Sequence, residues 1–356
     1  MVSKLLVMAN AVVTRGTTEG GRNVTIIMVT ILDNVAGAAL RGNAHAAEGD
    51  ASMLASQMSE PPASLSPGLA ALTAALYAKQ PDWNLYHYTS LAAMMSIVES
   101  RKMWASEIRY LNDSQELRHF ENSISGAVRD AEKRTDETSE IVRQFGAWLK
   151  ERVEKGPMAF VVSLSERGNL LSQWRGYCPH GQGVSLGFGP AGLVRAAAAG
   201  GFTLGRCIYD MKSHNGIVVQ VLNLVVQDAR AVGPSNQFHP SQSYHGFFQE
   251  IEGHILRIAA LLKHPSFSEE QEWRAVSKPI SHYVTNPICY RVGRTTLVPY
   301  LEWPLAEPDG VIDLPHVIVG PTLTPNLSIG AVSKYLSKYI PGHTRTVAAC
   351  DIPYRV

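Results

Sequence analysis

The stretch LYHYTSLAAMMSIVES (residues 85–100) decides the fold prediction, because it changes from strand to helix within a few residues. Residues 85–90 have the length and the aromatic content of a short strand, and from residue 91 the apolar side chains recur at helical spacing. A strand that leads directly into a helix places His87 at an open edge, where a ligand can approach backbone donors and a helix N-terminus. A histidine on a strand is also often a structural hydrogen-bonding residue, so both interpretations stay open.

A second strand pattern lies further along the chain. Residues 158–165 read MAFVVSLS and form the clearest buried strand of the sequence. A short helix at 170–177 and a glycine-rich turn at 179–183 lead into another strand at 184–188. This succession of strand, helix, turn and strand spans about 30 residues, the length of a common α/β unit.

The C-terminal part of the chain is rich in strands. Candidate strands at 290–292, 296–301 and 311–319 follow one another without intervening helices, which favours antiparallel pairing. We therefore predict an α+β fold with a split, mainly antiparallel central sheet flanked by helices. One domain is expected over residues 66–356, with helical insertions near 114–155 and 212–264.

Residues 1–65 differ from the rest in composition. The apolar run at 24–40 is interrupted by Asp33 and Asn34, which makes it a poor membrane span. Ala44-His45-Ala46 resembles a signal-peptide cleavage site, but the apolar run begins late. Three prolines between residues 59 and 67 indicate a linker. We expect a poorly ordered N-terminal extension, consistent with a start codon assigned too far upstream.

Charge and cysteine content restrict the class of protein. The 356 residues carry a net charge of +1, so no global basic field binds nucleic acid non-specifically, although a local basic groove remains compatible with this total. The four cysteines are widely spaced and read as free thiols of a reducing compartment. The sequence thus predicts a cytoplasmic protein with no metal site and no stable membrane association.

Three segments, far apart in the sequence, contain the candidate catalytic and ligand-binding residues. The first is His87 with Tyr88 and Thr89, the second is the Ser163-Leu164-Ser165 strand end, and the third is EEQEWR at 269–274. Side chains alternate along a strand, so Ser163 and Ser165 share a face, as do two carboxylates in Glu-x-Glu. Taken singly, each piece also has a plain structural interpretation, as a strand-end residue, a helix cap or a solvated acidic turn.

The order His-x-Thr, Ser-x-Ser and Glu-x-Glu resembles the ADP-ribosyltransferase superfamily, and residues 85–106 resemble the opening of its DNA-directed members. This resemblance implies NAD as a substrate and an unidentified nucleic-acid or protein acceptor. An oxocarbenium-like transition state needs a nearby carboxylate, and the acceptor must lose a proton. The catalytic residues expected from the resemblance are Glu272, Glu270 and His87, and the NAD-binding residues are His87, Tyr88, Thr89, Ser163 and Ser165.

The expected roles differ between these residues. Glu272 is expected to stabilise the developing positive charge and Glu270 to face the acceptor. His87 is expected to hold a ribose hydroxyl or the diphosphate as a hydrogen-bonding group rather than as a base. The chain departs from the superfamily at Tyr88, where glycine is usual, and in having Arg274 close enough to neutralise either carboxylate.

A second resemblance covers more of the chain. The motifs LYHYTS, LNDSQE, SLSERGNLLSQWRGY, G-x-SLGF, EEQEWR, VIVGPT and DIPYR resemble, in this order, the uncharacterised bacterial family called domain of unknown function 2971, over roughly residues 83–356. Two alternatives to the transfer of ADP-ribose stay open. One is an NAD or nucleotide hydrolase acting as a toxin or defence effector, and the other is a non-catalytic ligand-binding module of the same fold.

Overall fold

A computed structural model describes residues 65–111, 116–178, 183–280, 287–293, 295–306, 310–340 and 345–353, with the backbone of residues 14–17 and 23–26. The chain divides into two compact units, residues 1–60 and 61–356. In the first unit, β1 (Thr14–Thr17) and β2 (Asn23–Ile26) pair antiparallel. The predicted poorly ordered extension, residues 1–65, falls largely outside the described residues.

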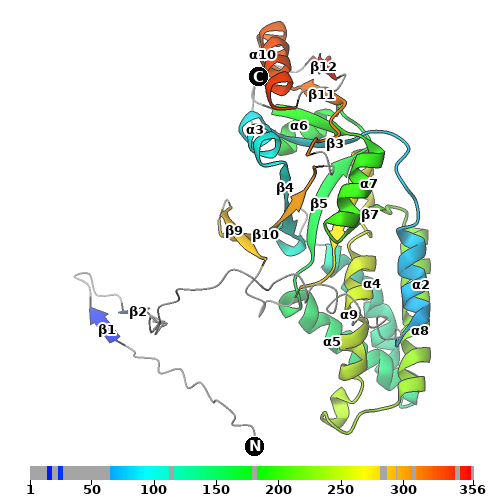
Figure 1. Cartoon of the computed structure of the whole chain (residues 1–356). Coiled ribbons are helices and arrows are strands. Elements are labelled where there is room, and N and C mark those ends of the chain that lie inside the picture. The colour runs from blue at the N-terminus through cyan, green and yellow to red at the C-terminus, as the bar shows by residue number, and fades with distance from the viewer. Residues whose placement is uncertain are drawn as a thin grey trace, which may run out of the picture. The chain divides into compact units, whose positions relative to one another are not determined.

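The second unit holds the strands and helices that build the site (Figure 1). Its strands are β3 (Leu85–Ser90), β4 (Lys102–Glu107), β5 (Phe160–Ser165), β6 (Gly183–Phe188), β7 (Phe202–Arg206), β8 (Glu272–Ser277), β9 (Cys289–Val292), β10 (Leu297–Pro304), β11 (His316–Val319) and β12 (Thr346–Ala349). Its α-helices are α2 (Pro67–Leu76), α3 (Leu91–Ser100), α4 (Glu116–Ala131), α5 (Glu137–Lys155), α6 (Leu171–Tyr177), α7 (Pro190–Ala199), α8 (Met211–Val232), α9 (His245–Ala259) and α10 (Pro325–Tyr339). Short 3₁₀ helices include η2 (Ile108–Tyr110), η3 (Pro240–Gln242) and η4 (Pro265–Glu270). In the described part of the chain, no helix combines the length and the apolar character that crossing a bilayer requires.

The strand-to-helix change predicted at residues 85–100 occurs at Ser90. Its hydroxyl accepts a hydrogen bond from the backbone N–H of Ala93 at 3.1 Å and so caps the first turn of α3. The helix ends at Arg101, whose φ of 57° is left-handed and stops further helical turns. Cap chemistry therefore fixes the length of α3 and returns the chain into β4.

The strands form one mixed, mostly antiparallel sheet. Its order is β12-β11-β6-β3-β5-β4-β10-β9, and β8 joins β5 to β7 as a branch. Among the described strand pairs of this sheet only β11 and β12 run parallel. The predicted α+β class with a mainly antiparallel sheet flanked by helices is thus confirmed.

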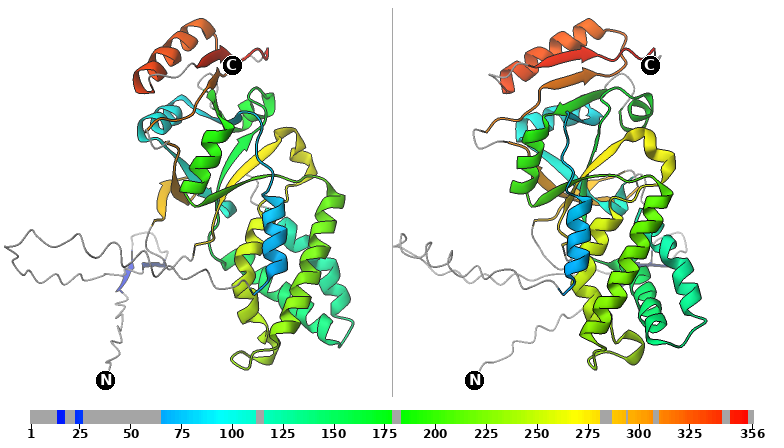
Figure 2. Two further views of the ribbon diagram at one scale, coloured as in Figure 1. Left: turned by 45° about the vertical axis from the view of Figure 1, so that its right-hand side comes forward. Right: turned by 90° about the vertical axis from the view of Figure 1, so that its right-hand side faces the viewer.

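Two apolar cores lie on opposite faces of this sheet. Phe160, Val162 and Leu164 of β5 pack into a core with α3, α7 and α10, whereas Val161 packs into a second core with α2, α4, α5, α8 and α9. Figures 1 and 2 show that the five helices of this second core, α2, α4, α5, α8 and α9, gather at one end of the sheet. The period-2 alternation of β5 is what allows one strand to serve both cores.

The sheet splits at β5. One edge of β5 pairs with β8 over five residues, from Val161 opposite Val276 to Ser165 opposite Glu272. On the other edge β3 pairs only at Ser165 and β4 only at Val161 and Phe160. No described strand pairs with residues 162–164 on that second edge, because β3 turns towards β6 and β4 towards β10. The backbone of β5 is therefore open in the middle of the sheet.

Candidate functional site

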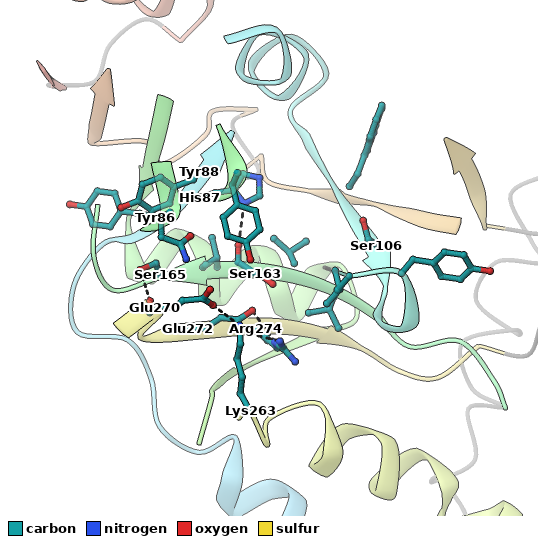
Figure 3. A pocket seen from close by; sticks show the side chains of 18 of the residues that line it. Tyr86, His87, Tyr88, Ser106, Ser163, Ser165, Lys263, Glu270, Glu272 and Arg274 are labelled. Carbon is teal, nitrogen blue, oxygen red and sulfur yellow. Dashed lines mark hydrogen bonds and ion pairs between the residues drawn. The ribbon is translucent and has the colours of Figure 1, made fainter. Parts of the chain in front are cut away.

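The candidate site is a pocket at this split (Figure 3). It collects residues from all three sequence pieces, although they are separated by up to 185 positions along the chain. Of the residues expected to form the site, the pocket is lined by His87, Tyr88, Ser163, Ser165, Glu270 and Glu272. Thr89 does not belong to the described lining; its backbone carbonyl accepts a hydrogen bond from the Cys178 thiol.

His87 lies on β3 with one ring nitrogen committed to the backbone. Its Nδ1 is 3.1 Å from the carbonyl oxygen of Ser163, and because a carbonyl only accepts, Nδ1 carries the proton. Burial lowers the pKa of His87 below its usual value of 6.5, while the bond to Ser163 raises it less. The ring is therefore neutral at pH 7, with Nε2 as a hydrogen-bond acceptor.

Ser165 fixes the backbone beside the carboxylates. Its hydroxyl donates to the carbonyl of Glu270 at 2.7 Å and accepts from the backbone N–H of Arg167 at 3.0 Å. Both bonds lie within the protein, so the Ser165 hydroxyl fixes the backbone at Glu270 and Arg167. Ser163 lines the pocket in the open part of β5 and holds His87 by its carbonyl.

Glu272 is the most strongly neutralised group in the site. Its Oε1 accepts from Nε of Arg274 at 2.9 Å, and its Oε2 accepts from Nη2 of Arg274 at 3.1 Å and from Nζ of Lys263 at 2.7 Å. Burial alone would raise the pKa of Glu272, but Arg274 and Lys263 outweigh it and lower the pKa to about 2. Glu272 is ionised throughout the physiological range, and its charge is balanced within the protein.

Glu270 shares Lys263 with Glu272. Its Oε2 is 2.5 Å from Nζ of Lys263, and its side chain is 15% exposed, against 5% for Glu272. Although burial lowers the pKa of Lys263, the two carboxylates raise it above its usual value, so the lysine stays charged. Of the two glutamates, Glu270 is the one that a ligand reaches more readily.

Tyr88 has structural partners that the sequence did not indicate. Its hydroxyl donates to the carbonyl of Arg167 at 2.6 Å and accepts from the N–H of Leu170 at 2.9 Å. Its ring packs edge-on against Trp174 with centroids 4.8 Å apart. The expected packing of this ring on nicotinamide stays a prediction, and any ligand would meet a ring that is already fixed in place.

The pocket also contains side chains that the sequence analysis did not single out as site residues. Trp104, Tyr110 and Tyr177 line it and are 51%, 44% and 39% exposed. Arg291 lines it from β9, and its Nη2 donates to the Ser106 hydroxyl at 3.0 Å. The available signal was the short spacing of arginine and aromatic residues at Arg109-Tyr110, Arg175-Gly176-Tyr177 and Tyr290-Arg291.

Chemically, the site offers a neutral histidine acceptor, hydroxyl groups, aromatic faces and ion-paired carboxylates. No group of three or more His, Cys, Asp or Glu side chains among the described residues is arranged to hold a metal ion. Such a lining suits a polar organic ligand with hydroxyl groups, a flat ring and a negative charge.

Comparison with models of protein families gives a match over part of the chain. Residues 173–275 match the model of a family described as "Protein of unknown function (DUF2971)". The matched range runs from α6 to β8 and includes Lys263, Glu270, Glu272 and Arg274. No curated protein and no solved structure matches the chain.

Proposed function

We propose that this protein cleaves NAD and transfers ADP-ribose to an acceptor, on an ADP-ribosyltransferase-like fold. The observation that carries the proposal is the convergence of His87, Ser163 and Glu270 on one pocket at the split of the sheet. In the reaction the bond between C1′ of the ribose and the nicotinamide nitrogen breaks, and nicotinamide leaves with the electron pair. The acceptor atom then bonds to C1′, and its proton passes to bulk water.

His87 and Glu270 have distinct parts in this proposal. The Nε2 atom of neutral His87 accepts a hydrogen bond from a ribose hydroxyl and so orients the sugar. Glu270 stabilises the positive charge that develops at C1′, because a fixed carboxylate favours an oxocarbenium-like transition state. Ser165 is a positioning residue, since it holds the backbone of Glu270.

The expected role of Glu272 changes with the geometry. From the sequence, Glu272 was the residue expected to stabilise the developing charge. Both of its oxygens accept bonds from Arg274 or Lys263, so its charge is largely compensated before a ligand arrives. We therefore assign the charge-stabilising role to Glu270 and a positioning role to Glu272, which holds Lys263 beside Glu270.

One observation favours the non-catalytic alternative. The carboxylates of Glu270 and Glu272 are matched by the cations of Lys263 and Arg274, and such a balanced network gives weaker stabilisation of a new positive charge than an unpaired carboxylate would. A ligand-binding module without chemistry would keep the pocket and this network and would bind NAD without cleaving it.

Incubation of the full chain with NAD labelled in the adenosine part tests the proposal. Label on a macromolecule indicates transfer, free ADP-ribose indicates hydrolysis, and intact NAD that remains bound indicates the non-catalytic module. We expect Glu270→Gln to lower the cleavage rate by about 100-fold, since it keeps the shape and removes the charge. Glu302→Gln is the matched control, because Glu302 is ion-paired with Lys102 at 2.6 Å outside the pocket. Equal rates for Glu270→Gln and the wild type would contradict the assignment of Glu270.

A further inference from the structure

The rim of the pocket carries exposed aromatic rings to which the proposed NAD cleavage assigns no role. Trp104 and Tyr110 come from β4 and η2 on one side of the split, and Tyr177 comes from α6, which packs on β3 at the other side. Each ring is more than a third exposed while lining the same pocket. Exposed aromatic rings around a polar pocket are a binding feature, because leaving them in water costs free energy.

The charge of the lining indicates the sign of the partner. Lys263, Arg274 and Arg291 are its cations, and Glu270 and Glu272 are its carboxylates, so the described lining has one positive charge in excess. The first two cations are tied to the two glutamates. Arg291 donates to the neutral Ser106 hydroxyl, so its positive charge stays available to an anionic partner. Ser106 lies on the β4 side of the pocket (Figure 3).

We propose that this rim binds a single-stranded nucleic acid, with its bases stacked on Trp104, Tyr110 and Tyr177 and a phosphate on Arg291. Aromatic platforms combined with basic groups are the general means of holding single strands, because every base has a π-face. A double helix does not fit this arrangement, since its bases are already stacked on one another. The inference that a single-stranded nucleic acid binds to the rim does not rest on the function proposed above. The inference that this nucleic acid accepts ADP-ribose does rest on it.

The face of the sheet on which Trp104 lies supports this partner. Trp104 packs on Tyr300 of β10 with ring centroids 4.6 Å apart and an angle of 32°, so the indole is held in a defined orientation. Trp104, Ser106 and Tyr300 share this face because they stand at alternate or opposite positions of the ladder. A ring held in place before binding loses little conformational entropy when a base stacks on it.

Titration of fluorescein-labelled ten-nucleotide strands with the full chain, in the absence of NAD, tests the inference. We expect Trp104→Ala and Tyr110→Ala each to weaken binding by about 5- to 100-fold. Trp83→Ala and Tyr290→Ala are the matched controls: their side chains are 45% and 61% exposed, and neither lines the pocket. Arg291→Gln is expected to reduce the slope of log affinity against log salt by about 0.7, the value for one phosphate of a single strand.

Three outcomes would overturn the inference. The first is equal affinity for single strands and duplexes of the same length. The second is unchanged strand affinity in Trp104→Ala and Tyr110→Ala, together with weaker NAD binding, which would assign the rings to NAD. The third is no strand binding while label from NAD is transferred to protein, which would make the acceptor a protein. Strand binding without NAD cleavage would instead contradict the proposed function and leave this inference standing.

Discussion

His87, which lines the pocket, bonds to the main chain through Nδ1, and Nε2 is the acceptor of the neutral ring. The role proposed for His87 depends on the ring staying neutral, because protonation would turn Nε2 from an acceptor into a donor. Burial supplies this neutrality by lowering the pKa. The bond to the carbonyl of Ser163 supplies the tautomer, so the chemistry of the residue is set by strand geometry as well as by its type.

We predict that His87 titrates below pH 6.5 in the folded chain. Because the folded-state pKa is lower than the unfolded one, the unfolded state binds more protons in acid. Stability from this group is therefore complete above about pH 6.5 and falls as the pH drops towards the folded-state pKa. The ring ¹H and ¹³C shifts of His87, assigned by comparison with His87→Gln, measure the value directly. A midpoint at or above 6.5 would contradict the prediction.

We predict that replacing Glu272 lowers the free energy of unfolding more than replacing Glu270 does. Glu272→Gln leaves Lys263 and Arg274 buried with less compensating charge, and the lowering of the Glu272 pKa from 4.5 to about 2 corresponds to ~3 kcal/mol of stability. That stability is present above the unfolded pKa and is lost as the pH falls towards 2.

The matched variant Glu270→Gln keeps Glu272 on Lys263 and should cost less than ~1 kcal/mol. Urea unfolding of both variants at pH 7 gives the comparison. If the order of the two losses is reversed, the ion-pair network described for Glu272 does not carry its stability.

At the scale of single elements, β6 has a glycine that its neighbours require. A Cβ on Gly187 would lie 2.6 Å from the ring of Tyr86 and 3.1 Å from the carbonyl oxygen of His316. Tyr86 cannot move away freely, because its hydroxyl is 2.9 Å from Nδ1 of His316 and its ring also lies against Gly168. The packing of Tyr86 at the edge of the pocket thus depends on the absence of a side chain in β6.

We predict that Gly187→Ala destabilises the fold by about 1–3 kcal/mol through overpacking. Gly126→Ala is the matched control, because Gly126 lies inside α4 and a Cβ there meets nothing within 4 Å. It should stabilise the protein by about 0.5–1 kcal/mol, since alanine favours a helix more than glycine does. Thermal and urea unfolding of the two variants should therefore shift in opposite directions, and a shared direction would argue against this account of β6.

The periodicity of the sequence predicted most helices and strands, but it did not predict which side chains the fold brings into contact. The alternation in MAFVVSLS predicted β5, and α4 and α5 form the helical insertion predicted near residues 114–155. The spacing of two residues in β8 already indicated that Arg274 neutralises a carboxylate, and it pairs with Glu272. The ion pair of Glu272 with Lys263, which follows α9, was not predicted, because it depends on how the chain returns to β8. The exposed rings of the rim were missed because single aromatic residues in short strands and short helices have the same pattern as core residues.

At the scale of the whole chain, the boundary between the two units lies close to a helix cap. The second unit starts at Pro61, and Ser66 is buried, caps α2 through the N–H of Leu69 and bonds to Asp228 of α8. A chain lacking residues 1–60 therefore keeps every one of these contacts. The same chain lacking residues 1–66 loses the cap and the bond to α8.

We predict that removal of residues 1–60 changes the melting temperature by less than about 2 °C. Ser66→Ala in the full chain should cost about 1 kcal/mol, or roughly 2–4 °C for a domain of this size. Differential scanning calorimetry of the wild type, the truncated chain and the serine variant tests both statements. A fall of many degrees on truncation would mean that the first unit contributes to the stability of the second.

The split of the sheet also has a mechanical meaning. On one side of the split the strand ladder continues through β3 and β6, on the other through β4 and β10, and among the described residues these two ladders pair with β5 only at its ends. A sheet that lacks strand pairing along part of a seam bends most easily across that seam. A ligand bound at the seam would contact both halves of the sheet and restrict their motion relative to each other. Occupancy of the pocket would then be transmitted as rigidity to strands that no ligand contacts.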